Sequence, residues 1–413
     1  MKSRAEITAR YADAYEEASK KEKGLILDQV MHVTGWCRDN ARRRLKQKAA
    51  RARGPVTRPV VRKPRPFKYS YDARKVLQQV WAISGGMCGE YLAAQMTDLL
   101  DSLEAHGILP GRSTRYTPQV RAELEAMSPA TINRYLKPVK DADPLRGKST
   151  TKPGSMLRQS ITIRKAGDEA AAEPGFFEMD TVAHCGPTLK GEFIRSVNLT
   201  DVNTGWVFTR AIRNNARVHI LATLKAAEQT IPYQIQGLDC DNGSEFLNHQ
   251  VVAWAGEKDI YFTRSRPYRK NDQATVESKN NHVIRRYGYY YRYDTPEELT
   301  LLNQLWALVN DRLNYFTPTK KPIGWTTDQA GRRKRVYDKP RTPYQRLIEA
   351  NVLSATQQAT LAATKASLNL DVIARRIDAI QHRLTLLAAK KTTDLKTRHT
   401  KPLPDPSGIK LTP

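Results

Sequence analysis

Three acidic residues occupy positions from which their carboxylates could act on one substrate. Asp180 lies at the end of an apolar segment, Asp241 directly follows another, and Glu277 lies about one turn into a segment with helical character. Asp180 and Asp241 are 61 positions apart, and 35 residues separate Asp241 from Glu277. If the two apolar segments are neighbouring strands, their carboxylates meet at one edge of the sheet, and a helix packed across that edge brings in the third.

Carboxylates arranged in this way are suited to hard divalent cations, because Mg²⁺ takes oxygen ligands and keeps several waters. Two such ions about 3.5–4 Å apart hold the attacking and leaving oxygens of an in-line displacement at phosphorus. Each acid alone is more often a solvated or capping group, and Asp241-Asn242-Gly243 in isolation is a turn. Together, in a strongly basic chain, they indicate phosphodiester chemistry.

The elements that would position these acids follow an α/β order between residues 173 and 316. β-Branched and aromatic runs predict five strands, at 176–182, 193–199, 206–209, 233–240 and 260–263. Helical spacing of apolar residues, including Val218, Leu221, Leu224 and Ala227 in the first segment, predicts helices near 218–227, 247–257, 275–287 and 296–316.

The composition agrees with a polyanionic partner. The 413 residues include 68 Lys and Arg against 42 Asp and Glu, a net charge of +26, with 40% hydrophobic residues. That apolar share excludes wholesale disorder, and the charge favours nucleic acid, although ribosome- or anionic-lipid-binding proteins share it. No segment has the roughly 18 uncharged apolar residues of a membrane span, so we expect no membrane partner. The four cysteines form no close pair, so we expect neither disulfides nor zinc, as in a cytoplasmic protein.

The first 48 residues are expected to form a helix-turn-helix DNA-binding domain. Apolar residues recur at helical spacing from Ala5, Thr34-Gly35 interrupts them, and a basic helix resumes at Trp36. An ordinary helical hairpin is the alternative. The expected DNA contacts are Arg38, Arg42 and Arg43.

A basic, proline-rich linker is expected over residues 49–71, either as a solvated segment or as an arm that follows DNA phosphates. Its expected contacts are Arg58, Arg62, Lys63 and Arg65. A second helical, helix-turn-helix-like domain is expected over 72–139. Its last helix starts at Ser128-Pro129, offers Thr131, Asn133 and Arg134 to DNA, and is expected to stop at Pro138. Residues 140–172 are a further expected linker.

The C-terminal part is expected to hold a small basic domain at 317–366, a helix at 367–390 and a flexible tail at 391–413. The helix carries apolar residues three and four apart, a seam that packs within the chain or joins two protomers. These are Leu370, Ile373, Ile377, Ile380, Leu384 and Leu387.

Three segments around the acids resemble DDE transposases and integrases with a retroviral-integrase-type core, specifically bacterial insertion-sequence transposases. They are Glu178-Met179-Asp180, Asp241-Asn242-Gly243-Ser244-Glu245-Phe246 and Lys270-Asn271-Asp272-Gln273-Ala274-Thr275-Val276-Glu277-Ser278-Lys279-Asn280. The spacing of 35 residues matches that family. The resemblance covers about 174–315, and the segments at 128–132 and 337–344 are similar to the flanks of such transposases.

The resemblance implies a multidomain protein with N-terminal all-α helix-turn-helix domains and an RNase H-like core of order βββαβαβα. It implies that Asp180, Asp241 and Glu277 hold two Mg²⁺ or Mn²⁺ ions, with Asp180 bridging both. Water, and then the freed 3′-hydroxyl, would attack phosphodiesters without a covalent protein–DNA intermediate. Double-stranded DNA (transposon ends and target), a homodimer or higher oligomer, and a nucleoid-associated place in a bacterial cytoplasm are implied as well.

Two departures from the family pattern concern zinc and a basic residue. His32 and Cys37 are the only nearby pair for a retroviral-type zinc site, so no zinc is expected. Ile284 stands where many members carry Lys or Arg, and the adjacent Arg285 is the candidate replacement for DNA contact.

Other polar residues near the acids are weighed individually. Asp201 is expected to be structural, Asp239 to point the same way as Asp241, and His184 to be core or surface unless it touches substrate. The expected phosphate contacts before the catalytic helix are Arg264, Arg266, Arg269 and Lys270, with Asn271 positioning the scissile strand. A domesticated transposase that acts as a DNA-binding regulator, and an RNase H-like nuclease, remain alternative functions.

Overall fold

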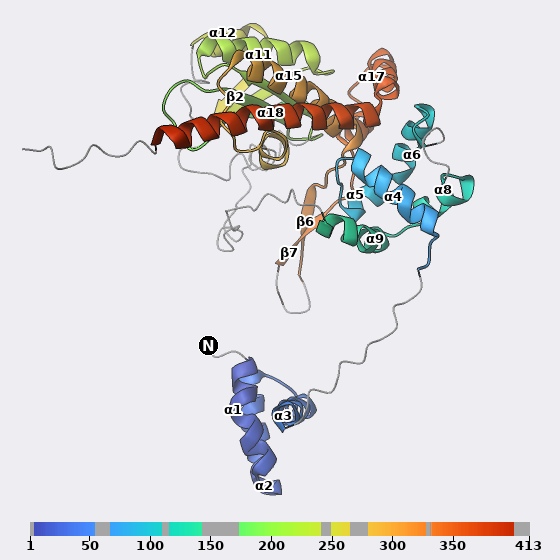
Figure 1. The fold of residues 1–413 in the computed structure, drawn as a ribbon, viewed down its shortest axis with the longest axis vertical. Coiled ribbons are helices and arrows are strands. Elements are labelled where there is room, and N and C mark those ends of the chain that lie inside the picture. The colour runs from blue at the N-terminus through green and yellow to red at the C-terminus, as the bar shows by residue number, and fades with distance from the viewer. Residues whose placement is uncertain are drawn as a thin grey trace, which may run out of the picture. The chain divides into compact units, whose positions relative to one another are not determined.

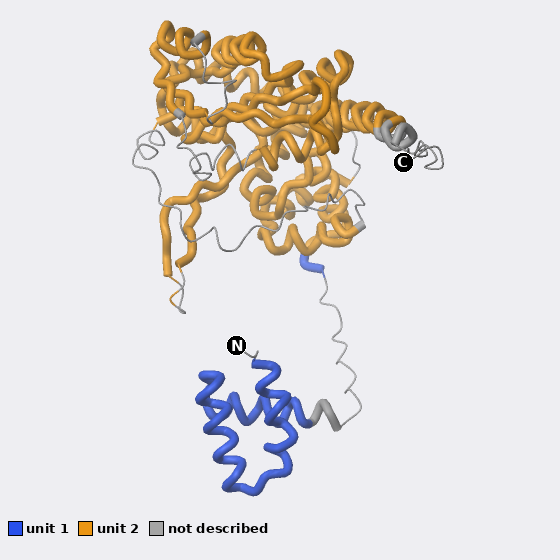
Figure 2. Tube along the Cα trace, turned by 90° about the vertical axis from the view of Figure 1, so that its left-hand side faces the viewer, with its two compact units in different colours: residues 1–68 blue, residues 69–413 orange. Residues whose placement is uncertain are grey.

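The computed structural model of the chain describes residues 4–53, 67–109, 115–142, 173–240, 249–264, 280–327, 331 and 333–399. The chain divides into two units, residues 1–68 and 69–413 (Figure 2). The three domains expected at 72–139, 173–316 and 317–366 all fall within the second unit. Within the described ranges, no helix combines the length and the apolar character needed to span a membrane.

Residues 4–53 of the first unit form three helices, α1 (Arg4–Glu17), α2 (Lys20–Thr34) and α3 (Arg38–Arg53). Ser19 and Glu22 form a capping box that starts α2, and Gly35, at φ 69°, ends it in a left-handed conformation that glycine adopts without strain. Tyr15, Leu27, Val30, Ala41 and Leu45 form the core. The predicted helix–turn–helix order is present, but α3 begins at Arg38 rather than Trp36 and continues through Arg53.

In the described part of residues 71–142, the second unit has five helices that bury the apolar faces predicted between 72 and 139. They are α4 (Tyr71–Ile83), α5 (Gly89–Ala94), α6 (Met96–Ala105), α8 (Pro118–Glu125) and α9 (Pro129–Ala142). The predicted stop at Pro138 is wrong, because α9 continues to Ala142. Proline inside a helix removes one backbone donor and clashes with the carbonyl four residues earlier. In α9 the turn that follows it carries the contacts Lys137–Asp141 (2.5 Å) and Lys140–Asn133 (3.3 Å).

A five-stranded mixed sheet follows, with strand order β3-β2-β1-β4-β5. β1 is antiparallel to β2, β2 is antiparallel to β3, and β4 is parallel to both β1 and β5. All five predicted strands are present, although the fourth begins at Gly237 instead of Tyr233. Their bounds are β1 (Phe176–Ala183), β2 (Arg195–Asp201), β3 (Val207–Ile212), β4 (Gly237–Cys240) and β5 (Tyr261–Arg264).

The two faces of this sheet differ in chemistry. Phe177, Met179, Leu199 and Leu238 lie on an apolar face, in one core cluster with residues of α11 (Arg217–Thr230) and α12 (His249–Glu257). In α11, Ile220 and Leu224 are buried, whereas Val218, predicted to belong to the packed face, is exposed. The other face, called here the polar face, carries Glu178, Asp180, Asn198, Thr200, Thr209 and Asp239, which alternate with the apolar residues along their strands.

The open edge of β3 is covered by asparagine side chains from α15 (Pro296–Asp311) and the π-helix η4 (Arg312–Phe316). Asn303 bonds the N–H and C=O of Ala211, Asn310 those of Thr209, and Asn314 those of Val207, at 2.8–3.2 Å. Each amide accepts through Oδ1 and donates through Nδ2. The three side chains thereby replace a neighbouring strand and protect the edge from pairing with other chains.

The C-terminal part forms a hairpin and three helices. These are β6 (Pro322–Thr327), β7 (Arg333–Tyr337), α16 (Pro343–Glu349), α17 (Ala355–Ser367) and α18 (Leu370–His399). The sequence did not predict the hairpin. The apolar seam of α18 packs within the chain, where Ile373, Ile377 and Leu384 join α15 in one core cluster. α18 also extends nine residues past its predicted end, to His399. Just past that end, Lys391 pairs with Asp294 and Glu298.

Candidate active site

Asp180 is held in a fixed orientation on the polar face. It lies in β1 opposite Asn198 of β2, and its Oδ1 accepts a hydrogen bond of 2.7 Å from the Thr181 N–H. Its Oδ2 accepts one of 2.5 Å from Asn280 Nδ2. Both of these donors are neutral, so they orient the carboxylate without neutralising its charge.

Asn280 links Asp180 to the next strands of the sheet. Its Oδ1 accepts from Asn198 Nδ2 (3.3 Å), and Asn198 Oδ1 accepts from Thr209 Oγ1 (3.1 Å). Asn280 is only 9% exposed. Its amide faces one way, because its Oδ1 meets the Asn198 donor and its Nδ2 meets the Asp180 acceptor. Sequence reasoning missed this residue. Its position could have identified it: Asn280 follows Glu277 by three residues, and residues three apart on a helix lie on the same face.

β4 ends beside Asp180. It runs parallel to β1, with Glu178 opposite Asp239 and Met179 opposite Cys240, the residue before Asp241. Asp239 therefore lies on the face of Asp180, where its Oδ1 accepts 2.8 Å from Thr263 Oγ1 of β5. Asp241 and Glu277 lie outside the described residues.

The chemistry of this face fits a hard cation. Asp180 supplies carboxylate oxygens, the ligand type that Mg²⁺ and Mn²⁺ prefer, whereas the Asp239 carboxylate on the same face is bound by Thr263. Among the described residues alone, no group of three or more His, Cys, Asp or Glu side chains is arranged to hold a metal. The residues proposed to complete the site are the two acids outside that part of the chain.

Comparison with known proteins places this fold in a family. The integrase core domain model matches residues 170–270. The uncharacterized protein y4rM of Sinorhizobium fredii (strain NBRC 101917 / NGR234) is 33% identical over 323 residues, which span 78% of this chain and 88% of that protein. The chain belongs to the RNase H-like integrase and transposase family. Its five-stranded sheet with flanking helices is the integrase catalytic core fold.

Similar solved structures include two from viral integration. The catalytic core domain of BIV integrase is 19% identical and covers 43% of this chain and 95% of that chain, with a TM-score of 0.29. A chain of the simian T-cell lymphotropic virus intasome in complex with the PP2A regulatory subunit B56 gamma is 15% identical. The match covers 43% of this chain and 70% of that chain, with a TM-score of 0.30.

Two polar residues near Asp180 are structural in this integrase-type core. His184 is fully buried, with its Nε2 2.8 Å from Ser196 Oγ, which in turn accepts 2.9 Å from Trp306 Nε1. Burial lowers the pKa of His184 to about 3, so the ring is neutral and out of reach of substrate. Asp201 is also buried and accepts from Gly175 N–H (2.7 Å) and Thr204 Oγ1 (3.0 Å), while burial raises its pKa.

Arg285 lies at the end of a π-helical turn, η3 (Asn281–Arg285), which continues into α14 (Arg286–Gly288). A π turn has more residues per turn than an α-helix. The directions of the side chains at positions 284 and 285 therefore differ from those that α-helical spacing would give. Ile284 is buried. The Arg285 guanidinium lies 4.7 Å from the ring centroid of the exposed Tyr290. A role of Arg285 in DNA contact stays a prediction.

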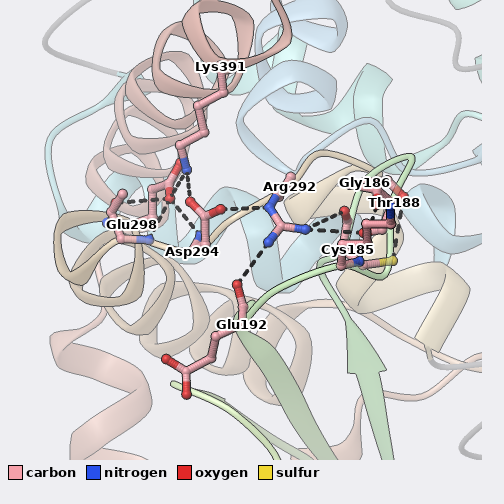
Figure 3. Close-up of polar contacts among 10 residues, drawn as sticks. Cys185, Gly186, Thr188, Glu192, Arg292, Asp294, Glu298 and Lys391 are labelled. Carbon is pink, nitrogen blue, oxygen red and sulfur yellow. Dashed lines mark hydrogen bonds and ion pairs between the residues drawn. The ribbon is translucent and has the colours of Figure 1, made fainter. Parts of the chain in front are cut away.

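The loop between β1 and β2 of the integrase-type core is fixed by one guanidinium (Figure 3). Arg292 donates to the carbonyls of Thr188 (3.1 Å) and Glu192 (2.9 Å), and its Nε donates to Asp294 (2.6 Å). Lys391 of α18 contacts Asp294 (2.5 Å) and the fully buried Glu298. Lys391 of the C-terminal helix thereby holds Asp294, and Asp294 in turn binds Arg292, the arginine that fixes this loop.

The predicted DNA contacts in the first unit lie on α3. Arg38 pairs with Asp28, Arg42 lies 3.7 Å from Asp39, and Arg43 donates to Asn40 (3.2 Å). All three arginines are exposed.

The predicted contacts in the second unit lie on α9. The Thr131 hydroxyl is 3.0 Å from that of Ser128, and Arg134 is exposed. Asn133 Oδ1 accepts 2.9 Å from the Gly89 N–H, which ties α9 to α5. Arg264 ends β5. The remaining predicted contacts lie outside the described residues: Arg58, Arg62, Lys63, Arg65, Arg266, Arg269, Lys270 and Asn271.

Proposed function

We propose that the protein is a DNA transposase that binds the terminal inverted repeats of an insertion sequence, cleaves the 3′ ends and joins them to target DNA. The observation that carries the proposal is the environment of Asp180. Its strand runs beside the strand that precedes Asp241, and its carboxylate is bound by Asn280, which follows Glu277 by three residues. This supports convergence of the three acids at one site.

In the proposal, Asp180, Asp241 and Glu277 hold two Mg²⁺ or Mn²⁺ ions. When bound, such ions polarise the attacking and leaving oxygens at a phosphodiester. The chain's own residues orient the site: Thr181 and Asn280 fix Asp180, and Asn198 fixes Asn280. The net charge of +26 favours a DNA duplex as substrate. Because both ends of an element must be processed together, the active species is a dimer or a larger assembly on DNA.

The test is a product assay with the full chain, Mg²⁺ and a labelled duplex that carries the DNA flanking the coding region. The proposal expects 3′ nicks at an imperfect inverted repeat and joined products. Asp180→Asn should bind the duplex normally and give neither product. Hydrolysis without joining would identify a nuclease, and DNA binding without either product would identify a regulator. Each of those two results overturns the proposal.

A further inference from the structure

The hairpin formed by β6 and β7 exposes both of its faces. Ile323, Trp325 and Tyr337 are 67%, 44% and 46% exposed, and none of them belongs to a core cluster of the described residues. The hairpin extends away from the other elements of the second unit (Figure 1). A two-stranded ribbon is marginally stable by itself in water, and an exposed Trp favours a partner that covers it.

The chemistry of the ribbon is that of a cation platform. Trp325 lies directly opposite Arg335 and diagonally opposite Arg333, so the three side chains share one face. Both guanidinium groups lie 5.0 Å from the Trp325 ring centroid. Contact with the ring restrains the arginines, and a restrained guanidinium suits bidentate binding of phosphate or guanine.

Cations are present on both faces of the ribbon. Lys334 lies opposite Thr326 on the face away from Trp325. Among the ion pairs between described residues, none includes Arg333, Lys334 or Arg335. A ribbon with positive charge on both faces can meet the phosphates of both strands that border a DNA groove.

The base of the hairpin is rigid. Asp338 accepts from the Lys321 N–H (2.7 Å) and from Arg346 Nη1 (2.6 Å), and Arg346 Nη2 donates to the Thr319 carbonyl (2.9 Å). Arg346 belongs to α16, whose Leu347 is buried in the core cluster that includes the sheet. The ribbon is therefore held at a fixed position on the unit that carries Asp180.

We propose that the β6–β7 hairpin is a DNA-binding ribbon that enters the major groove of a duplex, with Trp325, Arg333 and Arg335 as its contact face. The major groove, about 12 Å wide, admits a two-stranded ribbon without deformation of the duplex, whereas the minor groove, about 6 Å wide, must first be widened at a cost in free energy. The inference rests on the proposed function only in taking DNA as the partner, since it requires no catalysis.

The test compares full-length proteins in EDTA, so that binding is measured without cleavage. One variant combines Arg333→Ala with Arg335→Ala. The control, Arg376→Ala with Lys390→Ala, removes the same charge from exposed positions of α18. A third variant is Trp325→Ala. Fluorescence anisotropy with an end-containing duplex gives Kd over a range of salt concentrations.

The double arginine variant should bind at least about tenfold more weakly than the control. Its slope of log K against log salt should be smaller by about 1.8, or about 0.9 for each lost phosphate contact. Trp325→Ala should weaken binding about fivefold to tenfold with little change in slope. The wild type should protect guanine N7, in the major groove, from methylation, and the double arginine variant should not.

Equal binding and equal slopes for the double variant and its control would overturn the inference while leaving the transposase proposal standing. Protection of adenine N3 in the minor groove would overturn it too. Normal DNA binding with altered self-association would identify the ribbon as a protein interface. If the wild type bound no duplex, both proposals would fail.

Discussion

Asn280 Nδ2 lies 2.5 Å from Asp180 Oδ2, although the two residues are 100 positions apart in the chain. The bond ties the segment that follows Glu277 to the central strand of the sheet. Because Asn280 also accepts from Asn198, it cannot turn away without losing two hydrogen bonds. The orientation of the Asp180 carboxylate is thus set by an amide from another element.

Asn280→Ala should reduce the rate of DNA joining about 10- to 100-fold, as expected when a residue that orients a metal ligand is lost. DNA affinity should not change, and the Mg²⁺ concentration for half-maximal activity should rise. The matched control is Asn310→Ala, which removes an amide bound to the β3 backbone and should affect stability but not the Mg²⁺ requirement. An unchanged Mg²⁺ requirement in Asn280→Ala would exclude the positioning role.

Asn314→Ala should destabilise the second unit by about 2 kcal/mol, because it removes two hydrogen bonds and leaves the Val207 N–H and C=O unsatisfied in a buried position. Thermal unfolding measures the loss. Asn215→Ala, at an exposed position, should stay within about 0.5 kcal/mol of the wild type. Equal melting temperatures for the two variants would show that the hydrogen bonds of Asn314 to the β3 backbone contribute nothing to stability.

His184 should make the protein less stable in mild acid. Burial holds its pKa at about 3, against 6.5 ordinarily. Above pH 6.5 the ring is neutral in both states and contributes nothing. Below it, the unfolded chain binds a proton that the folded chain cannot, so the free energy of unfolding falls by about 1.4 kcal/mol per pH unit down to about pH 3.

His184→Gln should remove this dependence, since Gln retains an acceptor for Ser196 and does not titrate. From pH 7.5 to 5.5, the wild type should lose about 1.4 kcal/mol more than the variant in urea unfolding. The same loss in both proteins, or a His184 resonance that titrates near pH 6.5 in the folded state, would contradict the assignment of a neutral core histidine.

Arg292→Lys should loosen the loop between β1 and β2. Lysine can still pair with Asp294, but it lacks the fork that binds the Thr188 and Glu192 carbonyls. Amide hydrogen exchange over residues 185–192 should accelerate, whereas Arg213→Lys, a change in an exposed partner of the Glu192 side chain, should leave it unchanged. Wild-type exchange in Arg292→Lys would show that other contacts hold the loop.

The sequence predicted the elements whose signal is local. Runs of β-branched and aromatic residues located all five strands, and helical spacing located α15 and α18. It did not predict the partners of those elements: Asn303, Asn310 and Asn314 share one helical face, but nothing local indicates that they cover β3. The apolar seam of α18 was compatible with packing within the chain or with joining two protomers. In the structure it packs within the chain, on α15.

The hairpin and the end of α9 were missed for different reasons. Ile323, Trp325 and Thr327 alternate as a strand does, but the basic run at 332–335 hides the same alternation in β7 and resembles a solvated charge cluster. At Pro138 the local rule was outweighed, since contacts on either side of the proline stabilise the last turn of α9.

The central claim, that the carboxylates of Asp180, Asp241 and Glu277 form one metal site, is tested most directly by binding and activity together. Mn²⁺ titration and strand joining are measured for Asp180→Asn, Asp241→Asn and Glu277→Gln, with Asp239→Asn as the control. We predict that each of the three variants retains DNA binding but loses Mn²⁺ affinity and joining, while the control keeps all three. Normal joining by Asp241→Asn or Glu277→Gln, or loss of joining only in Asp239→Asn, would contradict the account.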